Sequence, residues 1–195
     1  MMTLMSLKRF LLVAVALLIT SCTTILVETT GEQGISEDPA ERTAGARVED
    51  QSIETKVIVN MKSQEPEFRK ANLNVISHNG VVLLVGQVVS NELKNKASEI
   101  ASQASSKIKR IHNELEIAGK TSLIARGNDA WIATKVRTLM LTNSGVSFRQ
   151  IRVVAENGAV YLMGLINQSN GDNAARLARN VSGVTRVVKV FEYIN

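Results

Sequence analysis

Residues 78–88, HNGVVLLVGQV, recur at residues 156–166 as ENGAVYLMGLI. Each stretch holds an Asn-Gly pair followed by a glycine inside an apolar run: Asn79, Gly80 and Gly86 in the first, and Asn157, Gly158 and Gly164 in the second. An Asn-Gly pair is the strongest short signal for a β-hairpin, because a type I′ turn needs positive φ at both central residues. The repeated hairpin therefore predicts that the chain contains one small domain twice.

The sequence around each hairpin predicts the same order of elements in both copies. Before the hairpin, apolar residues at helical spacing predict a helix with one buried stripe: Ile53, Val57 and Met61 in the first copy, and Ile132, Val136, Leu139 and Met140 in the second. Strands are expected at 72–77, 81–88 and 108–117 in the first copy, and at 151–156, 159–166 and 184–193 in the second. Between the last two strands we expect helices at 92–105 and 172–180, capped by Ser90 and Ser169.

A β-α-β crossover makes the last strand of each copy parallel to the strand before it. Both helices are then free to cover one face of the sheet. The predicted fold class is α+β, with two tandem domains of α-β-β-α-β order. Each domain is expected to have a three-stranded mixed sheet packed on two helices.

Two of the repeated glycines, Gly86 and Gly164, fall inside predicted strands, where glycine normally weakens the element. Two structural explanations are open: a packed helix approaches the backbone closely, or the strand contains a β-bulge. Together with the turn glycines Gly80 and Gly158, they are expected to serve the fold and not a ligand site.

The first 21 residues predict an export signal. Lys8 and Arg9 precede an apolar run at residues 10–19, which is too short to span a bilayer comfortably and has the form of a secretory h-region. The following Ile-Thr-Ser-Cys resembles the bacterial lipobox, in which the cysteine becomes an acylated N-terminus. A plain signal peptide with an incidental cysteine and an uncleaved membrane anchor are the alternatives.

Cys22 is the only cysteine of the chain, so it cannot form an intramolecular disulfide. By resemblance to lipoprotein sorting, it is the lipid attachment site, and Thr23 after it implies the periplasmic face of the outer membrane. Several acyl chains, such as palmitate, make anchoring stable, since each buried CH₂ is worth about 0.8 kcal/mol. Residues 22–48 have little apolar periodicity and are expected to be a lipidated N-terminus and flexible tether.

The repeated unit, its Asn-Gly hairpin and the V-x-x-V opening of its last strand resemble the BON domain family. The resemblance gives a first BON domain at 49–119 and a second at 120–195, and it is most specific in NDAWIATKVRTLMLT and ENGAVYLMGLI. It implies a non-enzymatic module that binds anionic phospholipids such as phosphatidylglycerol and cardiolipin. In an outer-membrane lipoprotein it also implies a role in envelope integrity and cell division.

The charges are divided unequally between the copies. Residues 49–119 hold nine basic and nine acidic residues, whereas residues 120–195 hold ten basic and four acidic residues. Near an anionic membrane, each well-placed Lys or Arg contributes roughly 1 kcal/mol within a Debye length. The excess positive charge therefore favours the second copy as the membrane contact, although a solvated basic surface without a ligand is the simpler alternative.

The first helix of the second copy has apolar bulk that its counterpart lacks. Trp131, Leu139 and Leu141 stand where the first copy has polar side chains: Ser52, Asn60 and Lys62. If the fold needed this bulk, both copies would have it. A tryptophan with lysine and arginine nearby is typical of a membrane-interface segment. The candidate phospholipid-binding residues all lie on this helix: Trp131, Lys135, Arg137, Thr138, Leu139 and Leu141.

Three alternatives to lipid contact remain for these surfaces. The surplus apolar side chains could fill an interface between the copies, to which Ile58 and Val59 of the first copy could contribute. The same surface could bind an envelope protein, which would make the chain a structural adaptor. The sheet edges could also support self-association. We further expect the helix to begin near Asn128, with Asp129 capping its N–H groups.

No pattern in the chain predicts catalysis. His78 and His112 lie in one copy, without a repeated spacing of histidine, cysteine or carboxylate that would form a metal site. A G-x-S-x-G nucleophile motif and a glycine-rich phosphate loop are also missing from the sequence. We expect no enzymatic activity, cofactor or metal, and no nucleic-acid partner because the chain is predicted to be exported.

Overall fold

The computed structural model describes residues 42–119 and 123–194. The predicted signal peptide, the attachment site Cys22 and the tether as far as residue 41 lie outside these residues. Within the described residues, no helix combines the length and apolar character needed to cross a membrane.

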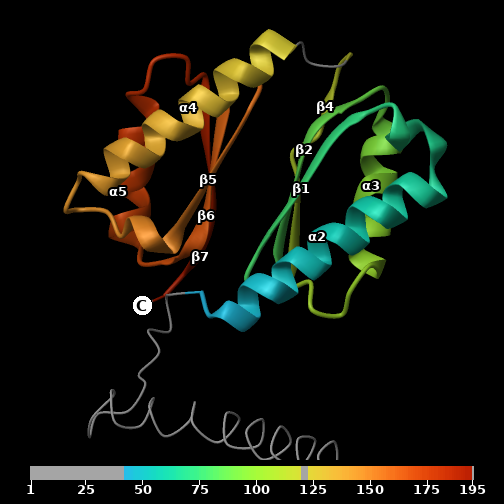
Figure 1. Ribbon diagram of the computed structural model, residues 1–195, viewed down its shortest axis with the longest axis horizontal. Coiled ribbons are helices and arrows are strands. Elements are labelled where there is room, and N and C mark those ends of the chain that lie inside the picture. The colour runs from blue at the N-terminus through green and yellow to red at the C-terminus, as the bar shows by residue number, and fades with distance from the viewer. Residues whose placement is uncertain (1–41, 120–122, 195) are drawn as a thin grey trace, which may run out of the picture. The chain divides into compact units, whose positions relative to one another are not determined.

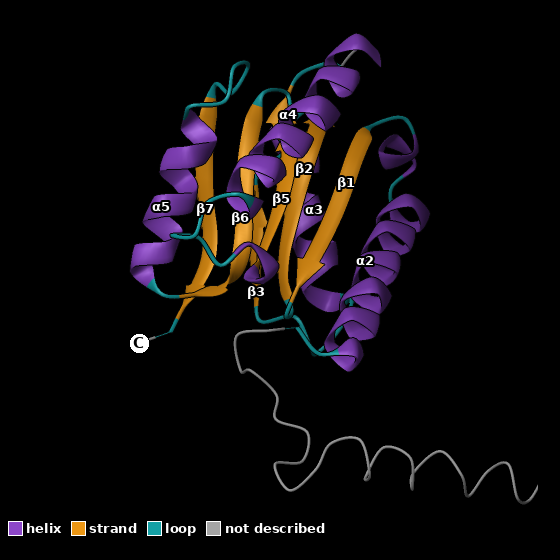
Figure 2. Ribbon diagram, turned by 60° about the vertical axis from the view of Figure 1, so that its left-hand side comes forward, coloured by secondary structure: helices purple, strands orange, loops and turns teal. Residues whose placement is uncertain are grey.

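The two copies have the predicted order of elements, and the α+β fold is confirmed (Figures 1 and 2). The first copy comprises α2 (Ala44–Gln64), the 3₁₀ helix η2 (Pro66–Arg69), β1 (Asn72–His78), β2 (Val81–Val88), α3 (Asn91–Gln103), β3 (Arg110–Asn113) and β4 (Glu116–Ile117). The second comprises α4 (Leu123–Leu141), η3 (Phe148–Gln150), β5 (Ile151–Glu156), β6 (Ala159–Ile166), α5 (Gln168–Arg179) and β7 (Arg186–Tyr193). In each sheet the hairpin is antiparallel, and the strand after the second helix runs parallel to its neighbour.

Several predicted boundaries are wrong. Helix α2 begins at Ala44 with Thr43 as its N-cap, so residues 44–48 are helical and not part of a tether. Ser90 caps α3 as predicted, because its hydroxyl accepts from the Leu93 N–H at 3.3 Å. Helix α5 instead starts at residue 168, capped by Asn167 and not by Ser169.

The last strand of the first copy is split into β3 and β4, which sequence periodicity did not predict. At the end of β3, Asn113 turns its amide toward α3 and donates to the Lys94 carbonyl at 2.6 Å and the Ser98 hydroxyl at 2.7 Å. Leu115 then enters the core with 1% of its surface exposed. The interruption of the strand therefore allows Asn113 to bond to α3 and Leu115 to enter the core.

Each copy has its own core between its sheet and its two helices. Ile53, Val57 and Met61 of α2 are fully buried, as predicted. The corresponding stripe of α4, Ile132, Val136 and Met140, is equally buried. Leu139, which the periodicity assigned to this stripe, is instead 42% exposed.

A third core joins the two sheets. Its buried residues come from both copies: Ile76, Val81, Leu83, Val85, Ala159, Tyr161, Met163 and Val190. Strand β2 is therefore covered on both faces, which accounts for its continuous apolar sequence. The alternative in which Ile58 and Val59 contribute to a contact between the copies is wrong, because Ile58 packs on its own core and Val59 is 53% exposed.

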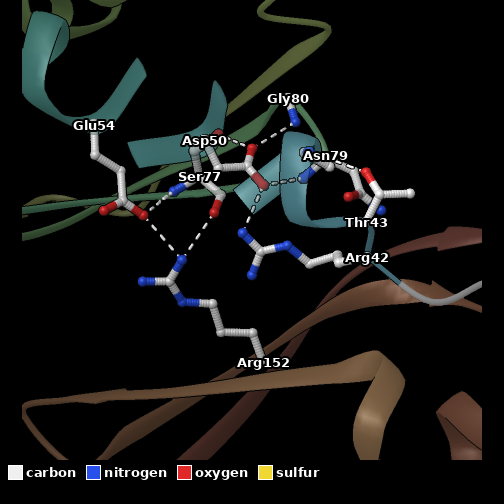
Figure 3. A network of polar contacts seen from close by, with 9 residues as sticks. Arg42, Thr43, Asp50, Glu54, Ser77, Asn79, Gly80 and Arg152 are labelled. Atoms are coloured by element: carbon white, nitrogen blue, oxygen red, sulfur yellow. Dashed lines mark hydrogen bonds and ion pairs between the residues drawn. The ribbon is translucent and has the colours of Figure 1, made fainter. Parts of the chain in front are cut away.

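A buried aspartate of the first helix holds the hairpin turn of the first copy (Figure 3). The Asp50 carboxylate accepts from the backbone N–H groups of Asn79 at 2.9 Å and Gly80 at 3.0 Å. It also accepts from the Ser77 hydroxyl at 2.7 Å and from the Arg42 guanidinium at 2.8 Å. Burial opposes ionisation of Asp50, but these hydrogen bonds and the charge of Arg42 hold its pKa below the usual value.

Asp129 makes the same contact in the second copy. It accepts from the backbone N–H groups of Asn157 and Gly158, both at 2.8 Å. Helix α4 begins at Leu123, so Asp129 lies inside the helix and the prediction that it caps a helix starting near Asn128 is wrong. In both copies, a helix is joined to the turn by a buried carboxylate that satisfies two N–H groups.

The strand glycines permit a close approach by the backbone at the start of the neighbouring hairpin strand: Asn72 is the first residue of β1, and Gln150 ends η3 immediately before β5. A Cβ at Gly86 would lie 1.9 Å from the carbonyl oxygen of Asn72, and one at Gly164 would lie 2.2 Å from that of Gln150. The φ of Gly86 is +121°, which side chains other than glycine rarely adopt. These glycines allow the hairpin strands to close at the end opposite the turn.

Replacing Gly86 with alanine is expected to lower the free energy of unfolding by on the order of 3 kcal/mol, since the methyl group overlaps the Asn72 carbonyl. Urea denaturation followed by far-UV circular dichroism measures this loss. Gly127→Ala in α4 is the matched control, because, apart from the backbone of its own helix turn and its chain neighbours, no described atom lies within 4 Å of its added Cβ. It should increase stability by up to about 1 kcal/mol. Equal unfolding midpoints for Gly86→Ala and the parent would contradict the steric explanation.

Asp50→Asn is expected to lower the free energy of unfolding by about 2–4 kcal/mol at pH 7, because the amide places an NH₂ group where the carboxylate accepts hydrogen bonds. The pKa of Asp50 is depressed on folding, so its contribution is complete above the unfolded value of 3.8 and is lost as the pH falls through the lower folded value. Denaturation between pH 2.5 and 7 should therefore show a weaker acid dependence for Asp50→Asn. Glu49→Gln, at an exposed neighbouring residue, is the control and should retain the parental profile.

Candidate functional site

The outward face of α4 exposes three large apolar side chains. Trp131 is 46% exposed, Leu139 42% and Leu141 68%. None of the three contributes to the core between the sheets, so they do not fill an interface between the copies. The apolar bulk that distinguishes α4 from α2 is therefore on the protein surface.

Lys135 lies against the tryptophan. Its Nζ is 4.3 Å from the centroid of the Trp131 ring, within the range of a cation–π contact. The ammonium group and the ring consequently form one amphipathic surface element. Arg137 points elsewhere, since its Nη2 donates to the Val153 carbonyl of β5 at 2.7 Å. The structure thus brings Trp131 and Lys135 together, whereas the guanidinium of Arg137 lies toward β5.

Threonines on α4 have internally satisfied hydroxyl groups. The Oγ1 of Thr134, Thr138 and Thr142 donates in each case to the carbonyl four residues earlier, at 2.9, 3.1 and 3.2 Å. Such bonds lower the cost of moving a hydroxyl out of water, because the donor keeps its acceptor. The hydroxyl group of Thr138, predicted as a lipid contact, is therefore suited to an apolar environment.

Polar contacts between the copies were not predicted from the sequence. Arg152 of β5 donates to the Glu54 carboxylate and to the Ser77 carbonyl, both at 2.9 Å (Figure 3). Arg186 of β7 pairs with Glu114 and Glu116 at 3.3 Å. These residues lie 70 to 98 positions apart in the sequence. Only the sheet-to-sheet packing brings them together.

Glu156 is a third polar contact between the copies and lines a groove of about 560 Å³ bounded by β1, α4 and β5. Its Oε1 accepts from the Asn72 amide at 2.9 Å and the Gln87 amide at 3.0 Å. Burial raises the pKa of Glu156 and the charges of Asp129 and Glu116 add to this, whereas the two amides act against it. The groove is lined by charged side chains of both signs, among them Arg126, Asp129 and Arg152.

In residues 42–119 and 123–194, no group of three or more His, Cys, Asp or Glu side chains is placed to hold a metal ion. His78 belongs to β1 and His112 to β3. The sequence-predicted glycines all lie at hairpin turns or strand contacts. The exposed face of α4 combines apolar side chains with the cationic Lys135.

Comparison with known proteins identifies relatives of the whole double unit. The sequence model of the BON domain family matches residues 49–119 and 128–195. The chain is 33% identical to Outer membrane lipoprotein DolP of Haemophilus influenzae over 83% of this chain and 82% of that protein. It is 35% identical to a 21 kDa hemolysin of Actinobacillus pleuropneumoniae over 78% of each chain. Among solved structures, the C-terminal domain of CdsD from Chlamydia trachomatis covers 75% of this chain and 67% of its own, with 13% identity and a TM-score of 0.30.

Glu156→Gln is expected to increase the free energy of unfolding at pH 7, because the amide oxygen still accepts both hydrogen bonds and carries no buried charge. The pKa of Glu156 is raised on folding, so its stabilising contribution is complete below the unfolded value of 4.5 and is lost as the pH rises through the folded value. The increase in the free energy of unfolding of Glu156→Gln over the parent, measured by urea denaturation, should thus be larger at pH 7 than at pH 4. Glu192→Gln, in β7, serves as control, and an equal gain at both pH values would refute the assignment.

Proposed function

The chain belongs to the BON domain family, and we propose that it is an outer-membrane lipoprotein whose second BON domain binds anionic phospholipid through α4. The name of the relative from Haemophilus influenzae supports this location. In this proposal Cys22 carries the acyl chains, and the folded domains lie in the periplasm and support outer-membrane integrity at division sites. Phosphatidylglycerol and cardiolipin are the expected ligands.

The observation that carries the lipid proposal is the exposed apolar face of α4. Full burial of a large apolar side chain contributes about 1.5–3 kcal/mol, and Trp131, Leu139 and Leu141 each keep part of that surface in water. Insertion of these side chains at headgroup depth removes the exposed surface. Because the threonine hydroxyls of the same helix are already bonded, few polar groups lose a partner in the process.

Charge provides the preference for anionic lipid. With the Trp131 ring in the interface, the Lys135 ammonium beside it reaches headgroup phosphates, and such a contact is worth roughly 1 kcal/mol. The two contributions together give only a modest affinity for a free domain. For an anchored protein this is sufficient, because attachment at the N-terminus raises the effective concentration of α4 at the membrane.

Trp131→Glu is expected to reduce binding to anionic vesicles at least tenfold, since it removes the ring and places a negative charge among phosphates. The measurement is cosedimentation of residues 23–195 with vesicles of phosphatidylcholine, with and without phosphatidylglycerol or cardiolipin. Binding should also weaken as salt is raised. The matched control is Val59→Glu, which changes an exposed apolar residue of the equivalent helix α2.

Two results would reject the proposal. The first is that Trp131→Glu binds anionic vesicles as the parent does while its thermal unfolding is unchanged. The second is that the parent fragment does not pellet with any anionic vesicle, which would favour an adaptor that binds an envelope protein through α4.

A further inference from the structure

A pocket with a volume of about 280 Å³ lies where the two copies meet and is lined by arginines from both. They come from distant parts of the sequence: Arg42, Arg47, Arg137, Arg149 and Arg152. Three belong to the second copy, and the corresponding positions of the first copy are neutral: Ile58, Ala71 and Asn74. Part of the basic excess of the second copy is therefore gathered here.

The arginines outnumber the carboxylates that pair with them. Arg42 pairs with Asp50 at 2.8 Å and Arg152 pairs with Glu54 at 2.9 Å. The guanidinium of Arg137 bonds to the neutral carbonyl of Val153 and makes no ion pair with a described residue. Within the described ranges, Arg47 and Arg149 make no ion pair. Three of the five guanidinium groups that line the pocket thus have no ion-pair partner in the part of the chain that the structure describes, an arrangement that an anion would stabilise.

A buried histidine adds a polar atom to the pocket. His78 lines the same pocket and is 5% exposed, and its Nδ1 has no hydrogen-bond partner among the residues that the structure describes. Burial and then the charge of Arg42 lower the pKa of His78 to about 4, against the opposing charge of Asp50. The imidazole is consequently neutral near pH 7 and can present one N–H group. Buried polar atoms without a hydrogen-bond partner are uncommon. An oxygen atom of a bound molecule would supply the partner that the Nδ1 of His78 lacks among the described residues.

We propose that this pocket binds a phosphate group, held by Arg47, Arg137 and Arg149 and reached by His78. Guanidinium groups match phosphate oxygens in a planar, two-bond geometry, and several of them can share one phosphate. Phe148, Ile151 and Val153 form an apolar wall beside the cations, which suits the carbon atoms of a phosphate ester. The phosphate belongs either to a lipid headgroup or to a small water-soluble molecule.

This site is separate from the face of α4 that carries the proposed function. Arg137 extends toward β5, whereas Trp131 is exposed and contacts Lys135. The inference does not depend on membrane insertion of α4, so each site can be tested while the other is intact.

The test is calorimetric titration of the full chain in dodecyl maltoside with two probes, sodium phosphate and dihexanoyl phosphatidylglycerol, at constant ionic strength. We expect Arg149→Gln to weaken binding of at least one probe about tenfold and Arg47→Gln with Arg149→Gln about 100-fold, as expected for charged hydrogen bonds. Arg179→Gln, an exposed arginine at the end of α5, is the charge-matched control and should bind as the parent does. Circular dichroism confirms that each variant is folded.

The outcomes separate the two ligand sources and the two sites. Binding of inorganic phosphate that is lost in Arg149→Gln and kept in Trp131→Glu supports a site for phosphate itself. Arginine-dependent binding of phosphatidylglycerol alone supports a headgroup site. The inference is overturned if neither probe binds at millimolar concentration, if Arg179→Gln weakens binding equally, or if phosphatidylglycerol binding depends on Trp131 but not on Arg149. In the last case the proposed function survives.

Discussion

A buried carboxylate that accepts two backbone N–H groups of a left-handed turn is the contact on which both domains depend. Asp50 and Asp129 each join the first helix of their copy to its Asn-Gly turn. The contact fixes how each helix is rotated over its sheet. Since successive residues of an α-helix are turned by 100°, the residue two positions after Asp129 must point away from it. The exposure of Trp131 thus follows from the bond made by Asp129.

Much of the fold could be predicted because local chemistry determines it. The Asn-Gly pairs required positive φ, and the turns adopt it at Asn79 and Asn157. The periodicity of α2 and α4 identified the buried stripe, apart from Leu139. The aspartate contact was missed because apolar periodicity does not register a buried polar residue. A signal was available, since Asp50 and Asp129 are repeated at the same distance before the shared Ile-x-Thr-Lys-Val.

The candidate site was predictable in part, for a different reason. Comparing the two copies isolated Trp131, Leu139 and Leu141 as bulk that the fold does not need, and the structure places all three on the surface. The guanidinium of Arg137 bonds to β5 and does not lie beside Trp131, because sequence proximity does not fix the direction of a side chain. The arginine pocket could not be predicted, since its residues span more than 100 positions and meet only through the packing of one sheet on the other.

The third core packs the two domains of one chain against each other, as an interface packs the two subunits of a dimer. In a dimer of identical subunits, any substitution appears on both halves at once, so a new surface feature is always duplicated. Here the strands that face the partner sheet are constrained to stay apolar, while each outer helix can change independently. That freedom permits one half to carry a tryptophan and the other a serine. The covered sheets therefore allow two similar domains to differ in their outer helices, so that a large apolar surface is exposed on α4 and not on α2.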